Sequence, residues 1–181
     1  MEPITWLIIS LISLIFSGLF SGTEIAFVTS NRVRVELDMQ KGGLTGKFIN
    51  WFYSDPEFFI STILVGNNIV LVIYGMGAAA LLDPWIKEYI TANEALVLIL
   101  QTIISTAIIL LTGEFLPKTI FRINPNSSLK YLSLPIAFFY IILYPISKFT
   151  SGLSKLLMKM CGAEVQDAKT GMLSVGDLNQ Y

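Results

Sequence analysis

Residues 112–118 read Thr-Gly-Glu-Phe-Leu-Pro-Lys, and they close an apolar run that begins at Leu96. About 20 apolar residues, rising about 1.5 Å each, are enough to cross the roughly 30 Å hydrocarbon layer of a membrane. Within that layer a polar group costs several kcal/mol unless it finds a partner. The stretch therefore predicts a membrane-spanning helix that carries a polar site near one end.

The composition of the whole chain also indicates a membrane protein. Of its 181 residues 54% are hydrophobic and 14% are charged, and the mean hydropathy is +0.67. A soluble domain is normally less apolar and more charged, and no basic patch suggests a nucleic-acid partner. The chain has no histidine and a single cysteine, Cys161. This excludes an intrachain disulfide, a multi-cysteine metal site and a Ser-His or Cys-His catalytic pair.

Three segments are long and apolar enough to span a membrane. They cover about residues 4–28, 58–82 and 95–122. The first is too long for a typical secretory signal and has no basic segment before it, so we interpret it as an uncleaved span. The connection after the first span carries four basic residues, whereas the connection after the second carries only Lys87. Since basic residues favour the cytoplasmic side, the N-terminus is predicted to lie outside and the first connection inside.

The first connection, about residues 31–55, has a helical pattern of its own. Apolar residues alternate with polar ones up to Lys41-Gly42-Gly43, and a second apolar group follows at residues 48–53. This pattern is typical of a short helix that ends at a glycine turn and is followed by a second helix. We predict a cytoplasmic helical hairpin.

A fourth apolar stretch, residues 131–147, is ambiguous. Basic residues flank it on both sides, and Pro135 and Pro145 each remove a backbone donor. We predict a kinked juxtamembrane helix over about residues 127–160, lying along the cytoplasmic boundary, with a fourth span as the alternative. Residues 1–162 would then form the transmembrane domain. The less apolar residues 163–181 are expected to start a truncated cytoplasmic region, so that the C-terminus is cytoplasmic.

Each predicted span carries polar residues that hydrocarbon normally excludes, which makes them functional candidates. The clusters are Ser17, Ser21 and Glu24 in the first span, Gly66, Asn67 and Asn68 in the second, and Gly113, Glu114, Pro117 and Lys118 in the third. The members of the first cluster are spaced by four and three residues, so they share one face of a helix. We expect the three clusters to converge.

Pro117 explains why a glycine and a glutamate are neighbours. A proline has no N–H for the carbonyl four residues earlier, here that of Gly113, and its ring pushes that carbonyl aside. Inside a membrane the freed oxygen needs a partner, and a cation beside the Glu114 carboxylate is one such partner. Serine hydroxyls, asparagine oxygens, a carboxylate and a carbonyl form an all-oxygen set. Such a set suits a hard cation, Mg2+ first, with Na+ or Ca2+ as alternatives.

Each cluster also has a purely structural interpretation. The alternatives are close helix packing for the pairs Ser17/Ser21 and Gly18/Gly22, an interhelical hydrogen bond for Asn67 and Asn68, an ion pair between Glu114 and Lys118, and solvation at the cytoplasmic surface for Glu24. Each cluster alone is a weak signal, and the three together favour a cation site.

The motifs resemble, in their order and spacing, the transmembrane domain of the CorC/CorB and cyclin M (CNNM) magnesium transporters. The resemblance rests on Phe-Ser-Gly-Thr-Glu at 20–24, Gly-Asn-Asn at 66–68 and Gly-Glu-Phe-Leu-Pro-Lys at 113–118. It implies an all-α integral membrane protein that forms a homodimer. Each subunit would have three transmembrane helices, a cytoplasmic helical hairpin and a kinked juxtamembrane helix.

The resemblance also implies a function, which is Na+-coupled export of Mg2+ by alternating access, in the inner membrane of a bacterium. Cytoplasmic CBS modules are expected in the full-length chain. Carried over by position, the metal ligands would be Ser21, Asn67, the Gly113 carbonyl and Glu114, with Ser17 and Asn68 as second choices. The residues Gly22, Glu24, Gly66, Pro117 and Lys118 would shape the site. Leu71 stands where family members commonly have a further asparagine, which leaves open which amide faces the ion.

Three other functions are alternatives to an ion transporter. A passive divalent-cation channel would need the same ligands, and a structural membrane dimerisation domain would need none. An intramembrane enzyme is the least favoured, because the sequence has no histidine, no GxSxG motif and no GxxxxGK[ST] motif. We therefore expect no enzymatic activity.

Overall fold

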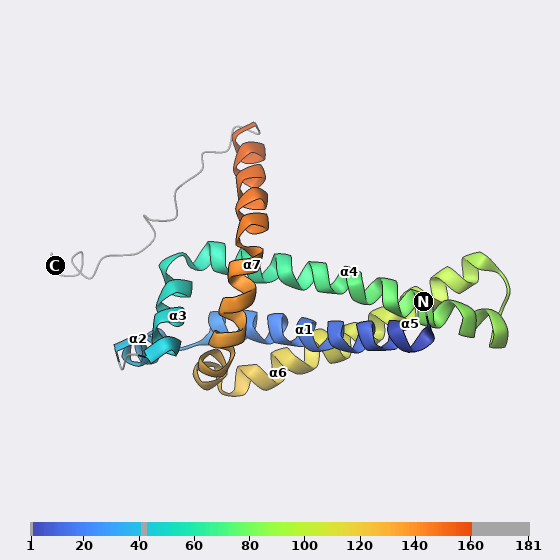
Figure 1. The fold of residues 1–181 in the computed structure, drawn as a ribbon, viewed down its shortest axis with the longest axis horizontal. Coiled ribbons are helices and arrows are strands. Elements are labelled where there is room, and N and C mark those ends of the chain that lie inside the picture. The colour runs from blue at the N-terminus through green and yellow to red at the C-terminus, as the bar shows by residue number, and fades with distance from the viewer. Residues whose placement is uncertain (1, 41–42, 161–181) are drawn as a thin grey trace, which may run out of the picture. The chain divides into compact units, whose positions relative to one another are not determined.

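The computed structural model describes residues 2–40 and 43–160, and every regular element in them is a helix (Figure 1). The elements are α1 (Pro3–Thr29), α2 (Arg32–Gln40), α3 (Gly43–Ser54), α4 (Pro56–Tyr89), α5 (Glu94–Ile109), the π-helix η1 (Leu110–Phe115), α6 (Leu116–Ile123) and α7 (Pro125–Met160). The predicted all-α class is confirmed. The turn predicted at residues 41–42 and the region predicted at 163–181 lie outside the described residues.

The chain divides into two compact units. The first is Met1–Tyr144 and contains α1 to α6 with the first part of α7. The second begins at Pro145 and contains the remainder of α7, up to Met160 in the described residues. All the motifs singled out in the sequence lie in the first unit.

In the described part of the chain, four helical stretches are long and apolar enough to cross a membrane. They are Pro3–Thr29, Pro56–Tyr89, Glu94–Ile123 and Pro125–Met158. The last belongs to α7, which covers Pro125–Met160 where we predicted a helix over about residues 127–160. Its length and composition allow the fourth span that the sequence left as the alternative. The count of three spans therefore stays a prediction.

Short polar and proline signals start the long helices. The Asp55 carboxylate accepts the backbone N–H of Phe58 at 3.1 Å, and Pro56 follows it in the first helical position of α4. The Asn93 side chain accepts the N–H of Ala95 at 3.0 Å at the start of α5. Such side chains satisfy donors that a helix leaves free at its N-terminus.

An aromatic core joins α1, α3, α4 and α7 within the first unit. The fully buried Phe59 ring has its centroid 4.6 Å from Phe27, 4.4 Å from Phe52 and 5.5 Å from Tyr140. Burying one such side chain stabilises a protein by about 2–3 kcal/mol. This core attaches the short helix α3 to the ends of two long helices.

A hydrogen bond at the end of α1 adds to this attachment. The Tyr53 hydroxyl donates to the Phe27 carbonyl at 3.2 Å and is 2.5 Å from the Ser30 hydroxyl. Burial raises the pKa of the Tyr53 hydroxyl, so the phenol keeps its proton and remains a donor at neutral pH.

Helix α1 is the central element of the first unit. It runs beside α4, and its C-terminal half lies against η1 and α6 (Figure 1). Phe20, Ser21 and Thr23 of α1 are fully buried. Because α1 has α4 on one side and η1 on another, its serine face can meet groups from both.

Candidate functional site

The third predicted span contains a π-helix where the sequence reading predicted a kink. Element η1 covers Leu110–Phe115, and the N–H of Leu116 donates to the carbonyl of Leu111. In an α-helix that N–H would donate to Thr112, and the next donor, residue 117, is a proline without an N–H. Two successive carbonyls, those of Thr112 and Gly113, therefore lose their α-helical donors. Single π-turns inside α-helices occur frequently at functional sites.

Sequence reasoning found the consequence of Pro117 for Gly113 and missed the π-helix itself. The available signal was Pro117 after an otherwise continuous apolar helix. A proline explains one missing hydrogen bond. It does not by itself explain why the preceding turn is widened, so that Leu116 donates to a carbonyl five residues earlier; we attribute this to the packing of η1 against α1. That packing is a tertiary contact, so local sequence does not reveal it.

Ser17 is the point where three elements meet. Its side chain is completely buried, and its hydroxyl donates to the Asn67 side-chain oxygen at 3.0 Å, which links α1 to α4. A Cβ placed on the buried Gly113 would lie only 3.0 Å from the same hydroxyl. Groups from α1, α4 and η1 thus lie together, as the sequence predicted. Ser17, a second choice from the sequence, lies at their centre.

Ser21 lies one helical turn after Ser17 on the same face of α1. It is 1% exposed, and its hydroxyl has no hydrogen-bond partner among the described residues. A hydroxyl in a helix can donate to the backbone carbonyl four residues earlier, as Thr23 does to the Leu19 carbonyl at 2.7 Å. A buried polar group left unpaired costs about 1–3 kcal/mol. Ser21 therefore offers an oxygen that the fold leaves available.

Glu114 follows Gly113 in η1 and carries a negative charge. Its side chain is half-buried, and its carboxylate makes no hydrogen bond or ion pair with any described residue. The alternative in which Lys118 pairs with Glu114 is wrong, since the Lys118 ammonium lies 3.3 Å from the Glu24 carboxylate on α1. Glu24 is accordingly an ion-pair partner and is more than a solvated surface group.

Asn68 is the predicted ligand that the structure does not bring to Ser17. It is exposed, and as the neighbour of Asn67 it points about 100° around α4 from it. The departure at Leu71 had left open which amide faces the site. In this structure the amide beside Ser17 is that of Asn67.

The predicted site-shaping glycines allow close helix packing. A Cβ on Gly22 would overlap the Phe121 ring of α6, and a Cβ on Gly66 would lie 2.7 Å from Leu143 of α7. Pro117 contributes in the same way, because its ring packs against Gly18. On α1 the glycine pair packs against α6, while the serine pair presents its hydroxyls to the neighbouring face. The packing and the polar interpretations of this helix are therefore compatible.

The donor set is made of oxygen atoms and carries little charge. Within residues 2–40 and 43–160, no three His, Cys, Asp or Glu side chains lie close enough together to hold a metal ion. The groups that lie beside Ser17 are the Asn67 amide oxygen and the Gly113 backbone, and Glu114 follows Gly113 in the chain. Oxygen ligands of this kind bind hard cations such as Mg2+ and Na+ and have little affinity for soft metals.

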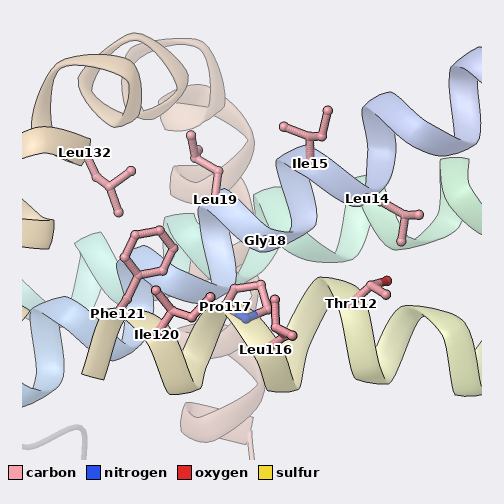
Figure 2. A pocket seen from close by; sticks show the side chains of 10 residues that line it. All are labelled: Leu14, Ile15, Gly18, Leu19, Thr112, Leu116, Pro117, Ile120, Phe121 and Leu132. Atoms are coloured by element: carbon pink, nitrogen blue, oxygen red, sulfur yellow. The ribbon is translucent and has the colours of Figure 1, made fainter. Parts of the chain in front are cut away.

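A hollow of about 430 Å³ lies near these residues but has a different character (Figure 2). It is lined by Leu14, Ile15, Gly18, Leu19, Thr112, Leu116, Pro117, Ile120, Phe121 and Leu132. Its one hydroxyl, that of Thr112, already donates to the Ile108 carbonyl at 2.7 Å. None of the predicted ligands lines it. This apolar hollow between α1 and α6 is therefore unsuited to a cation.

Comparison with known proteins gives one family match over nearly the whole chain. The family described as "Cyclin M transmembrane N-terminal domain" matches residues 8–181. This range includes all three polar clusters.

Several curated bacterial proteins are similar to the same region. The UPF0053 inner membrane protein YfjD of Escherichia coli is 28% identical over 162 residues, which is 90% of this chain and 36% of that protein. The UPF0053 protein MG146 of Mycoplasma genitalium is 33% identical over 82% of this chain and 35% of its own length. Its homologue in Mycoplasma pneumoniae is 36% identical over 67% of this chain and 27% of its own length. The chain thus spans about a third of the relatives that it matches.

Proposed function

This chain belongs to the family of cyclin M transmembrane N-terminal domains, and from that membership we propose that it transports magnesium ions across a membrane. It is an integral membrane protein by its long apolar helices and by its likeness to a bacterial inner membrane protein. The observation that carries the proposal is the meeting of Ser17, Asn67 and Gly113. Glu114 follows Gly113 in η1, and its carboxylate has no ion-pair partner among the described residues.

The proposed ligands of the transported Mg2+ are Ser21, Asn67, the Gly113 carbonyl and Glu114. Ser21 contributes because its buried hydroxyl has no hydrogen-bond partner in the part of the chain that the structure describes. Ser17 orients the Asn67 amide through its hydrogen bond and can also coordinate the ion once that bond is released. Mg2+ requires near-octahedral oxygen coordination and usually keeps several waters, so these groups need to replace only part of its hydration shell.

The charge of the site suits transport better than storage. One carboxylate leaves a bound divalent ion with a net positive charge, which limits affinity in a membrane. A transport site must bind tightly enough to admit the ion and weakly enough to release it. We propose that entering Na+ satisfies the single Glu114 charge and thereby helps Mg2+ to leave.

The remaining parts of the proposal concern the whole transporter. The chain would act as a homodimer by alternating access, with its N-terminus outside and its C-terminus in the cytoplasm. The stretch α5–η1–α6 would be the moving element, because it carries the π-turn, a feature that occurs frequently at functional sites. In the longer full-length protein, cytoplasmic CBS modules would follow this domain.

Flux into liposomes tests the function. Purified protein is reconstituted with a Mg2+-sensitive dye inside the vesicles, and Glu114→Gln and Glu114→Ala are compared with Thr112→Val. Thr112 is the matched control, because it lies in the same π-helix and its exposed side chain lines the apolar hollow. We expect flux to be lost in both Glu114 variants and kept in Thr112→Val. Wild-type flux in folded Glu114→Gln would contradict the proposal.

The same assay separates the alternatives. Flux that is independent of a Na+ gradient would favour a passive channel with the same ligands. No flux, together with no Mg2+-dependent change in thermal stability, would favour a structural dimerisation domain. We propose no catalytic role for any residue.

A further inference from the structure

The ion pair between Glu24 and Lys118 lies next to the proposed Mg2+ site. The Glu24 carboxylate is 3.3 Å from the Lys118 ammonium, and the pair links α1 to α6. Glu24 follows Ser21 by three residues, and Lys118 follows Glu114 by four. Each partner is thus about one helical turn beyond a proposed ligand. The two side chains are 26% and 40% exposed, so they are neither deeply buried nor fully solvated.

Lys118 has one carboxylate as its ion-pair partner and a second, Glu114, four residues earlier in the chain. A lysine ammonium stands on a flexible four-carbon stem, so it can reach groups on neighbouring turns. Glu114 is therefore the local alternative partner for Lys118. In the structure Lys118 pairs with Glu24, and Glu114 makes no ion pair with a described residue. The longer-range partner, from a different helix, is the one that holds the ammonium.

The choice of partner decides whether the site can accept a cation. An ammonium on Glu114 would neutralise the one carboxylate of the site and occupy the position that Mg2+ needs. On Glu24 the same ammonium is held away from that carboxylate. Building on the proposed function, we propose that Glu24 is a positioning residue that holds Lys118 off Glu114 and so keeps the site open for Mg2+.

This role makes the two partners act in opposite directions. Glu24→Gln releases Lys118, which then pairs with Glu114 and competes with the ion, so Mg2+ affinity falls by about tenfold, a usual size for coupling between neighbouring charged groups. Lys118→Met removes the competing charge and raises Mg2+ affinity. The double variant Glu24→Gln/Lys118→Met has no ammonium to release, so its affinity returns to the wild-type value or exceeds it. Lys118→Arg keeps the charge and the pair, and it behaves like the wild type.

Isothermal titration with MgCl2 tests the proposal on the wild type and these four variants, with Glu114→Ala as the baseline without binding. A merely structural ion pair predicts a different pattern. Glu24→Gln and Lys118→Met would then change affinity in the same direction, and the double variant would match either one. That pattern, in proteins whose wild type binds Mg2+ and whose Glu114→Ala does not, would overturn the role of Glu24 and leave the proposed function intact.

A second readout needs no metal. Thermal unfolding in Mg2+-free buffer measures the cost of Glu114→Gln in the wild-type and in the Glu24→Gln background. We expect a larger fall in Tm in the second background, because Lys118 then has Glu114 as its partner. Equal costs would overturn the proposal. If the wild type binds no Mg2+, the proposed function fails, and this comparison still decides whether Glu24 positions Lys118.

Discussion

At the scale of single residues, Ser21 is the proposed ligand whose hydroxyl is buried without a hydrogen-bond partner among the described residues. Packing alone would favour alanine at this position, because alanine fits a helix and leaves no unpaired hydroxyl. The buried oxygen of Ser21 is unpartnered instead. A group that costs stability and is nevertheless present is typical of a functional site.

Ser21→Ala should therefore separate stability from binding. Removing the unpaired hydroxyl should leave Tm unchanged or raise it, whereas Mg2+ binding should weaken by about tenfold because one ligand is lost. Thermal unfolding and titration of the same preparation measure both quantities. A large fall in Tm with unchanged Mg2+ affinity would mean that Ser21 is structural.

Gly113 is the second residue with a narrow geometric requirement. An added Cβ would lie 2.7 Å from the Ile109 side chain and 3.0 Å from the Ser17 hydroxyl. Gly113→Ala should therefore push η1 away from α1, lower stability by about 1–3 kcal/mol and reduce Mg2+ flux. Gly75→Ala is the matched control, since nothing lies within 4 Å of its Cβ position. It should keep wild-type stability and wild-type Mg2+ flux. Full flux in Gly113→Ala would show that this contact is unimportant.

At the scale of elements, the π-helix η1 connects the backbone to the site. The N–H of Leu116 donates to the carbonyl of Leu111 rather than to that of Thr112, and Pro117 has no N–H to donate to the Gly113 carbonyl. The carbonyl that the sequence marked as available is thus accompanied by that of Thr112. Two neighbouring main-chain oxygens without α-helical donors make η1 the natural place for a cation to contact the third span.

Pro117→Ala tests this role of the element. The new N–H can donate to the Gly113 carbonyl, so the helix should become more regular and Tm in Mg2+-free buffer should rise. The increase in Tm on adding Mg2+ should shrink, because the carbonyl is now occupied. Pro84→Ala, near the end of α4, adds an N–H away from the site and should leave the Mg2+ effect unchanged. An undiminished Mg2+ effect in Pro117→Ala would contradict a metal-binding role for η1.

Much of this arrangement could be predicted from local sequence. The apolar runs and their polar interruptions indicated the long helices, and the spacing of Ser17 and Ser21 placed them on one face. The partner of Lys118 could not be predicted, because Glu24 is distant in the chain and Glu114 is the local alternative. The orientation of Asn67 rather than Asn68 toward Ser17 depends on the rotation of α4 in the packed unit. The extent of α7 was predictable, since Pro125–Met160 is close to the helix expected over about residues 127–160, whereas its position relative to a membrane depends on more than local sequence.

At the scale of the whole molecule, the number of spans determines on which side the two ends of the chain lie. Three spans with an outer N-terminus place the residues after α6 in the cytoplasm. A membrane-crossing α7, which its length and composition allow, would place Cys161 on the outer side. The hairpin α2–α3 is inside in both arrangements.

Cys161 is the single cysteine of the chain and thus a natural probe of this topology. With three spans, a membrane-impermeant maleimide should label it only after the cells are permeabilised. Lys87→Cys in a Cys161→Ser background is the control, because residue 87 belongs to the connection predicted outside and should be labelled in intact cells. Labelling of Cys161 in intact cells would establish the fourth span and exclude our topology.

The most direct test of the central claim is the heat of Mg2+ binding to the purified protein, measured by isothermal titration beside Glu114→Ala. Oxygen ligands from α1, α4 and η1 around one carboxylate predict saturable binding in the wild type and none in the variant. Equal binding in the two proteins, or no binding in a folded wild type, would contradict a magnesium site at this place.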